Sequence, residues 1–140
     1  MLTTLLPCLL YADGGALRMR AQDGNLVLIA FTSPVPLRVG MADVSVLVQR
    51  AVDQSPVMDG EVTLRLSGPQ RVEITVHAKH AQATNKLLYA ANVNFANVGN
   101  WTLHVNYRKG GDSANAATEF NVLPEAPVLL TYWPELAVVP

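Results

Sequence analysis

Residues 86–107 constrain the fold most strongly, because large apolar and polar side chains alternate there through two neighbouring stretches. A period of two is typical of a β-strand with one buried face and one wet face. The residues expected to point inward are Tyr89, Ala91, Val93 and Phe95 in the first stretch, and Trp101, Leu103, Val105 and Tyr107 in the second. Residues 97–100 resemble a tight turn, so the two strands are expected to form a central hairpin.

Six further stretches show strand patterns, at residues 17–20, 25–31, 43–49, 61–66, 71–76 and 117–122. Turn signals separate them, among them Asp23-Gly24, Gly68-Pro69 and Gly110-Gly111. Residues 77–86 show neither a strand period nor a helix period. Short strands with regularly spaced turns predict an all-β fold, a single immunoglobulin-like antiparallel β-sandwich of about seven to eight strands.

Length and charge limit the classes of partner. With 140 residues the chain is expected to form one domain, and its formal net charge is -1 with 15% charged residues. This balance does not resemble the basic footprint of a nucleic-acid-binding protein, so we expect no nucleic acid as a partner. Cys8 is the only cysteine in the sequence, which excludes an internal disulfide.

The chain divides into three parts. Residues 1–15 are apolar and are either the remnant of a signal peptide or a packed N-terminus. Residues 16–123 form the predicted β-sandwich domain. Residues 124–140 are apolar and contain prolines; Tyr132 and Trp133 suggest either the start of a membrane anchor or a tail that packs on the sandwich.

Several stretches resemble a known family. They are Phe31–Gly40, Asp43–Gln49, Asp59–Leu66 and Asn85–Ala91 leading to Gly99-Asn100-Trp101. Together they resemble the YtkA-like domain family, which is similar in architecture to CopC-type copper-resistance domains and FixH-type extracytoplasmic domains. The resemblance implies an immunoglobulin-like sandwich in the periplasm or otherwise outside the cytoplasmic membrane, often behind a signal peptide and sometimes membrane-anchored.

His77 and His80 are the candidate metal ligands, because two imidazoles three residues apart at a strand end can converge on copper or zinc. His104 or one of the scattered methionines, Met19, Met41 and Met58, would have to complete such a site. The alternative is that both histidines are simply solvated, since Lys79 between them would repel a cation. The sequence also lacks the N-terminal histidine and Met-rich run of CopC-type copper carriers.

No hydrolase motif such as GxSxG or HExxH occurs in the sequence, so we expect no catalytic residues and no enzymatic activity. The predicted function is a non-catalytic binding or accessory module that needs no cofactor and supports envelope or respiratory-complex assembly. Its partner would be another envelope or membrane protein, with a further link to the membrane through the terminal segments. The alternative is a copper-handling domain that uses His77 and His80.

Overall fold

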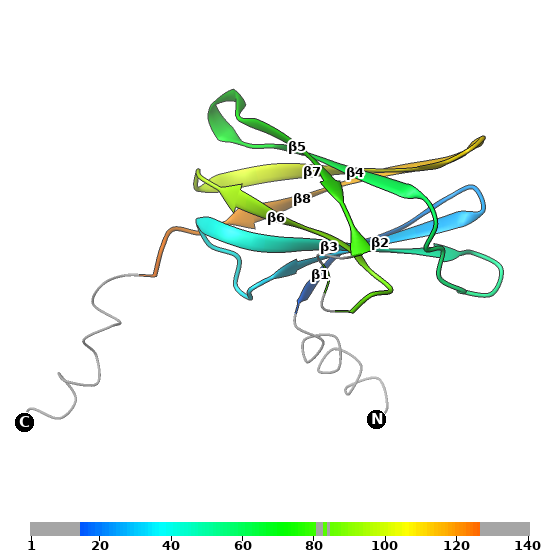
Figure 1. Cartoon of the computed structure of the whole chain (residues 1–140). Helices are drawn as coiled ribbons and strands as arrows, with labels where there is room; N and C mark the ends of the chain where they lie inside the picture. Colours follow the sequence, from blue (N-terminus) through cyan, green and yellow to red (C-terminus); the bar gives the residue numbers. More distant parts are fainter. Residues whose placement is uncertain (1–14, 81–82, 84, 127–140) are drawn as a thin grey trace, which may run out of the picture.

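The computed structural model describes residues 15–80, 83 and 85–126, and in this part of the chain eight strands form two antiparallel sheets (Figure 1). The strands are β1 (Ala16–Asp23), β2 (Leu26–Ser33), β3 (Gly40–Arg50), β4 (Glu61–Ser67), β5 (Glu73–Ala78), β6 (Tyr89–Phe95), β7 (Gly99–Lys109) and β8 (Asp112–Val122). The first sheet has the order β1-β2-β3-β6 and the second sheet has the order β5-β4-β7-β8. The predicted all-β sandwich is therefore confirmed.

Alternating side chains account for the packing of the two sheets. Every second residue of the central strands is buried, as the sequence predicted; these residues include Val44, Val46 and Val48 of β3, Val62, Leu64 and Leu66 of β4, and Leu103 and Val105 of β7. Burial of such side chains is the main favourable contribution to folding. The opposite row of each strand points away from the core, and in β4 and β7 that row forms the outer face of the second sheet.

Aromatic side chains fill the centre between the sheets. Trp101 is fully buried and meets Phe95 edge to face, with ring centroids 5.0 Å apart. Phe95 also lies edge to face with Phe120, at 5.9 Å. The indole Nε1 of Trp101 donates a hydrogen bond to the carbonyl oxygen of Asn97 at 2.9 Å, so its polar atom is satisfied inside the core. The expected inward positions of these aromatic residues are confirmed.

The predicted central hairpin is wrong. β6 pairs with β3 and β7 pairs with β4 and β8, so the two strands belong to different sheets. Residues 96–98 cross from one sheet to the other. Alternation shows which side chains are buried, but two strands that face each other across a core carry the same pattern as two strands paired in a hairpin. The core residues were therefore identified correctly and their strand pairing was not.

Three hairpins form where the sequence predicted turns, and one of them joins β4 and β5 at Gly68-Pro69. β1 and β2 are joined at Asp23-Gly24, and β7 and β8 are joined at Gly110-Gly111. Gly24 and Gly110 have φ values of 60° and 57°, a left-handed conformation that glycine adopts at little cost. β8 begins at Asp112, earlier than residue 117, because its small and polar first residues pair with β7 directly after the turn.

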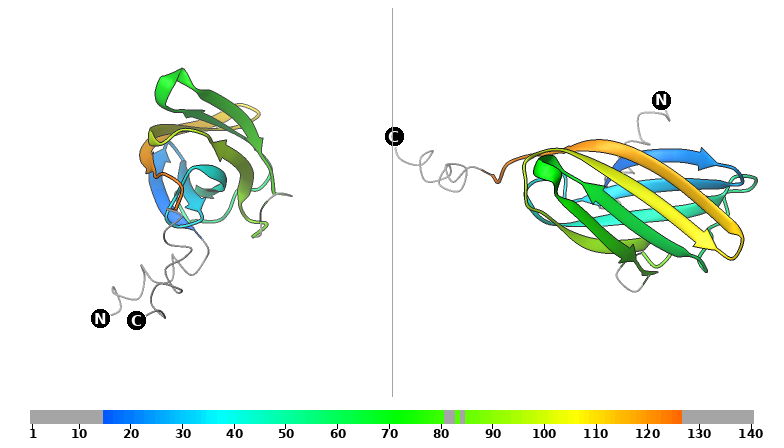
Figure 2. Two further views of the ribbon diagram at one scale, coloured as in Figure 1. Left: turned by 90° about the vertical axis from the view of Figure 1, so that its left-hand side faces the viewer. Right: turned by 90° about the horizontal axis from the view of Figure 1, so that it is seen from above.

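Hydrogen bonds link the two sheets along both sides of the sandwich (Figure 2). On one side Lys79 and Ala90 exchange two backbone hydrogen bonds of 2.9 and 3.0 Å, which link the end of β5 to β6. On the other side the Thr118 hydroxyl of β8 donates to the Arg18 carbonyl of β1 at 3.1 Å. These contacts occupy parts of the sheet edges that could otherwise pair with another chain.

The predicted terminal segments fall largely outside this description. Residues 1–14 and 127–140, which hold Cys8, Tyr132 and Trp133, lie outside the described residues. Within the described ranges the structure contains no helix long and apolar enough to cross a membrane.

Candidate functional site

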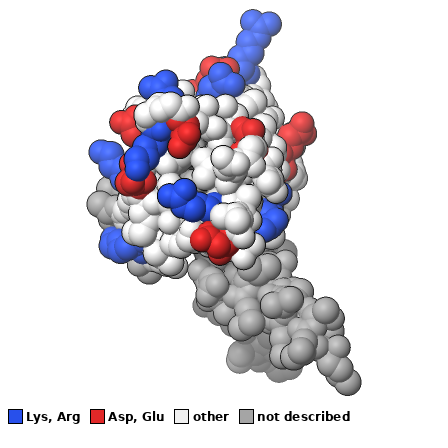
Figure 3. All heavy atoms as spheres, turned by 90° about the vertical axis from the view of Figure 1, so that its right-hand side faces the viewer, with Lys and Arg blue, Asp and Glu red and all other residues white. Residues whose placement is uncertain are grey.

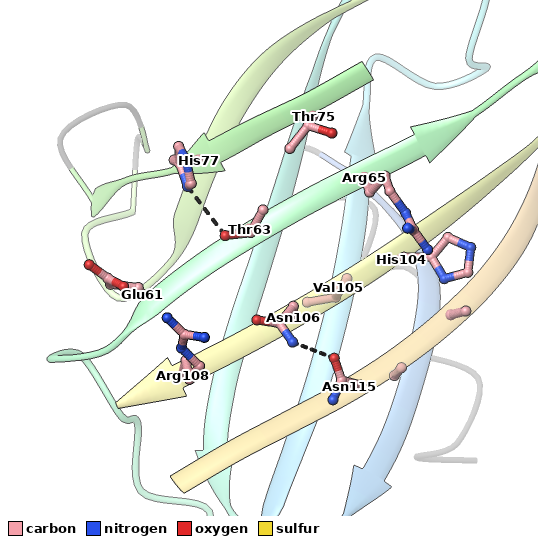
Figure 4. A pocket seen from close by; sticks show the side chains of 12 residues that line it. Glu61, Thr63, Arg65, Thr75, His77, His104, Val105, Asn106, Arg108 and Asn115 are labelled. Carbon is pink, nitrogen blue, oxygen red and sulfur yellow. Dashed lines mark hydrogen bonds between the residues drawn. The ribbon is translucent and has the colours of Figure 1, made fainter. Parts of the chain in front are cut away.

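The outer face of the second sheet contains a hollow of about 600 Å³, which we call the polar hollow (Figure 4). Side chains from all four strands line it. They include Thr75 and His77 of β5, Glu61, Thr63 and Arg65 of β4, His104, Asn106 and Arg108 of β7, and Asn115 and Ala117 of β8. A twisted sheet with short side chains in the middle and long ones beside them gives a concave surface.

The floor of the polar hollow is one cross-strand row. The strand register places His77, Thr63, Asn106 and Asn115 opposite one another across β5, β4, β7 and β8. The Thr63 hydroxyl and His77 Nδ1 are 3.2 Å apart, and the Asn106 amide donates to the Asn115 side-chain oxygen. The floor therefore presents hydroxyl, imidazole and amide groups, all of which exchange hydrogen bonds with a ligand readily.

Charged side chains rise on both sides of that floor. Arg65 lies opposite His104 on one side, and Glu61 lies opposite Arg108 on the other. Figure 4 shows Arg65 beside the His104 ring and Arg108 beside Glu61. With two arginines and one glutamate, the lining has a formal charge of +1 when its histidines are neutral (2 − 1). The chain as a whole has a formal charge of -1, so the hollow is locally more positive than the average surface.

His80 does not belong to the polar hollow. Its Nδ1 lies 2.9 Å from the Leu88 carbonyl oxygen and its Nε2 lies 2.8 Å from the Met58 carbonyl oxygen. Its ring packs on Tyr89, with centroids 4.0 Å apart. The side chain thus ties the end of β5 to two loops, a structural role that the sequence did not predict.

The two candidate metal ligands therefore have different surroundings. His77 is exposed on β5, whereas His80 is half-buried; both border a depression of about 410 Å³ at the end of β5, together with Lys79. A metal ion bound by His80 would have to displace one of its carbonyl contacts. Within the described residues, no three histidine, cysteine, aspartate or glutamate side chains come together as a metal site would require.

The other candidate ligands lie apart from this pair. His104 is two strands away from His77, with β4 and its Arg65 between them. Met19 is buried in the core, whereas Met41 and Met58 are exposed. Met58 approaches His80 through its backbone carbonyl. The structure does not bring His104 or these methionine side chains together with His77 and His80.

Two tyrosines lie beneath the end of β4. The Tyr89 hydroxyl donates to the Val57 carbonyl at 2.9 Å and accepts a hydrogen bond from the Gly60 backbone N–H at 3.3 Å. Burial raises the pKa of the Tyr89 phenol, and burial together with the nearby charge of Asp59 raises the pKa of Tyr107. Both phenols therefore stay neutral at physiological pH, and the Tyr89 hydroxyl holds the loop that leads into Glu61 of the hollow.

The loop end beside these tyrosines carries mixed charge. Lys109 pairs with Asp59, and the hydrogen bond from Lys109 lowers the pKa of that carboxyl group. On the end of the molecule shown in Figure 3, acidic and basic side chains are interspersed. This end presents no broad field of one sign, in contrast to the local excess of arginine in the polar hollow.

Replacing His80 with alanine is expected to lower the free energy of unfolding by about 1–3 kcal/mol, since at least one of its carbonyl contacts is a hydrogen bond in every protonation state. The matched variant His77→Ala removes an exposed ring and should change stability by less than about 0.5 kcal/mol. Denaturant unfolding followed by circular dichroism measures both. Equal stability of the two variants would contradict the structural role of His80.

The sequence did not predict the polar hollow, although its alternation places most of the lining side chains on wet rows. Thr63 and Arg65 were expected to face water, as were His104 and Asn106. The sequence does not show that β4 and β7 are neighbouring strands, which is what brings these side chains together. Because β6 and β7 lie in different sheets, Asn92 is on the outer face of the first sheet and Asn106 on that of the second.

Comparison with known proteins supports the fold. No protein-family model matches this chain, and no curated protein matches its sequence. Among solved structures, FetP of uropathogenic Escherichia coli strain F11, expressed in the periplasm, is similar with a TM-score of 0.63 and 10% identity, over 78% of this chain and 96% of FetP. A copper-bound FetP variant matches with a TM-score of 0.63 and 9% identity, over 77% of this chain and 97% of the variant.

A third solved structure shares the same architecture. A DUF4426 family protein of Pseudomonas aeruginosa PAO1 is similar with a TM-score of 0.60 and 10% identity, over 81% of this chain and 98% of that protein. At these identities the likeness shows a common β-sandwich fold. The YtkA-like resemblance stays a prediction.

Proposed function

We propose that this chain is a non-catalytic binding or accessory module that works outside the cytoplasmic membrane. It would present the outer face of the second sheet, with the polar hollow at its centre, to another envelope or membrane protein. The observation that carries the proposal is the hollow itself: a concave surface of about 600 Å³ built from outward-facing side chains of four rigid strands. Support of envelope or respiratory-complex assembly is the role that the YtkA-like resemblance suggests.

The shared fold supports the proposed location. FetP was expressed in the periplasm, and its sandwich covers most of this chain. A periplasmic or other extracytoplasmic site agrees with the apolar ends noted in the sequence, which would serve as signal and anchor remnants. Attachment to the membrane through those ends belongs to the same proposal.

Site-specific photo-crosslinking tests the proposed face. A photoreactive phenylalanine derivative at Ala117, an exposed residue that lines the hollow, is expected to capture a defined envelope protein in cells of the source organism. The matched control places the same group at Asn92, which is exposed on the outer face of the first sheet. Equal capture from both positions, or capture from Asn92 alone, would contradict the choice of face.

Copper handling is the second candidate, because the FetP variant with this fold was crystallised with copper bound. It predicts stoichiometric copper binding through His77 and His80, which His77→Ala would abolish. The accessory role predicts no such binding. Calorimetric titration of the purified protein and of His77→Ala with copper separates the two candidates.

A further inference from the structure

We propose that the polar hollow recognises carboxylate groups on an acidic segment of its protein partner. This inference rests on the proposed function, and it adds the chemistry of the ligand. Two arginines flank a floor of hydrogen-bond donors, and both come from the central strands of the second sheet.

The arginines stand on either side of the floor row. Arg65 on β4 is two residues from Thr63, and Arg108 on β7 is two residues from Asn106, in opposite directions along the antiparallel pair. At about 3.3 Å per residue, the two arginines are separated by about 13 Å along the strands. This separation suits an extended ligand that carries more than one negative group. Guanidinium groups bind carboxylates with two parallel hydrogen bonds, a match that lysine does not provide.

The floor between them can donate further hydrogen bonds. The contact between Asn106 and Asn115 uses one of the four hydrogens on their two side-chain amide nitrogens. Thr63 adds a hydroxyl group and His77 an imidazole ring. A carboxylate placed over this row therefore meets donors below it and an arginine at each side.

One acidic side chain in the hollow lowers the affinity for an anionic ligand. Glu61 lies directly opposite Arg108 and is the only carboxylate among the described residues that line the hollow. It competes with an incoming carboxylate for the Arg108 guanidinium. Because the two arginines outnumber the single glutamate, the net charge of the lining still favours an anionic ligand over a cationic one.

An acidic protein segment fits this surface better than nucleic acid does. Within the described part of the chain, the residues that line the hollow include no phenylalanine, tyrosine or tryptophan on which a base could stack. The excess of a single positive charge is also far below the basic stripe that a phosphate backbone requires. Scattered carboxylates on an extended polypeptide match both the spacing and the modest charge.

Calorimetric titration with two model peptides tests the inference on the full chain. A peptide of alternating glycine and glutamate is expected to bind, and the matched peptide of glycine and glutamine is expected not to bind. Arg65→Gln and Arg108→Gln should each weaken binding by about tenfold. Arg20→Gln is the control, since Arg20 is exposed on the outer face of the first sheet and should leave affinity unchanged.

Glu61→Gln provides a test that misfolding cannot imitate. It removes the competing carboxylate, so binding of the acidic peptide should tighten by about threefold to tenfold. Equal binding of both peptides, or weaker binding by Glu61→Gln, would overturn the inference. If the acidic peptide fails to bind while crosslinking from Ala117 still captures one partner, the proposed function stands and the acidic ligand is wrong. If neither occurs, the proposed function fails as well.

Discussion

Trp101→Ala is expected to lower the free energy of unfolding by about 3–5 kcal/mol, the usual cost of deleting a large buried aromatic side chain. Trp101 is completely buried, and it packs against Phe95 of the opposite sheet. The substitution removes this contact between the sheets and leaves a cavity that rigid strands cannot close. A marginally stable domain of this size would lose a large share of its total stability. Denaturant unfolding followed by far-ultraviolet circular dichroism measures the effect.

The control is Trp101→Phe, which keeps an aromatic ring in the core but deletes the hydrogen bond from Nε1 to the Asn97 carbonyl. It should cost less than the alanine variant, at about 1–3 kcal/mol. If Trp101→Ala unfolds at the same denaturant concentration as the parent protein, the ring is not the centre of the core. That result would contradict the packing of β6 against β7.

Gly60→Ala is expected to be the second strongly destabilising change, at about 3 kcal/mol or more, because it overfills a packed site. A β-carbon at Gly60 would lie 2.1 Å from Cε1 and 2.5 Å from the hydroxyl oxygen of Tyr107. Since Tyr107 is buried, its ring has no space to move away. Gly60 also donates its backbone N–H to the Tyr89 hydroxyl, so a displaced backbone would weaken that contact too. Thermal unfolding by calorimetry tests the prediction.

Gly111→Ala is the matched control for Gly60→Ala. A β-carbon at Gly111 has no heavy atom within 4 Å, and the residue does not adopt a positive φ. We expect its stability to stay within about 0.5 kcal/mol of the parent protein. A similar loss in both glycine variants would show that backbone freedom, rather than the Tyr107 ring, determines the cost.

The same strands build the core and the polar hollow. Val62 and Leu64 of β4 point inward, while Glu61, Thr63 and Arg65 between and beside them point outward. The spacing of the candidate ligand contacts is therefore fixed by core packing rather than by a loop. Sites supported in this way hold their geometry well. A core variant that keeps the fold but shifts β4 against β7 should change ligand affinity as well.

Several features could be predicted from the sequence because they depend on neighbouring residues. The strand patterns, the inward rows of β3 and β4, and the turns at Gly24 and Gly110 all follow from local periodicity and turn chemistry. The start of β8 could not be predicted this way. Its first residues lack a row of large apolar side chains, and they are a strand because β7 pairs with them.

Local periodicity was enough to predict that the chain forms strands with alternating faces and which of their side chains are buried. The tertiary structure alone decided that β6 and β7 lie in different sheets, that His80 contacts Leu88 and Met58, and that Arg65 and Arg108 flank one floor. The physical reason is that a period of two describes a strand's own two faces. The choice of neighbouring strand depends on contacts between residues far apart in the chain, which no local pattern contains.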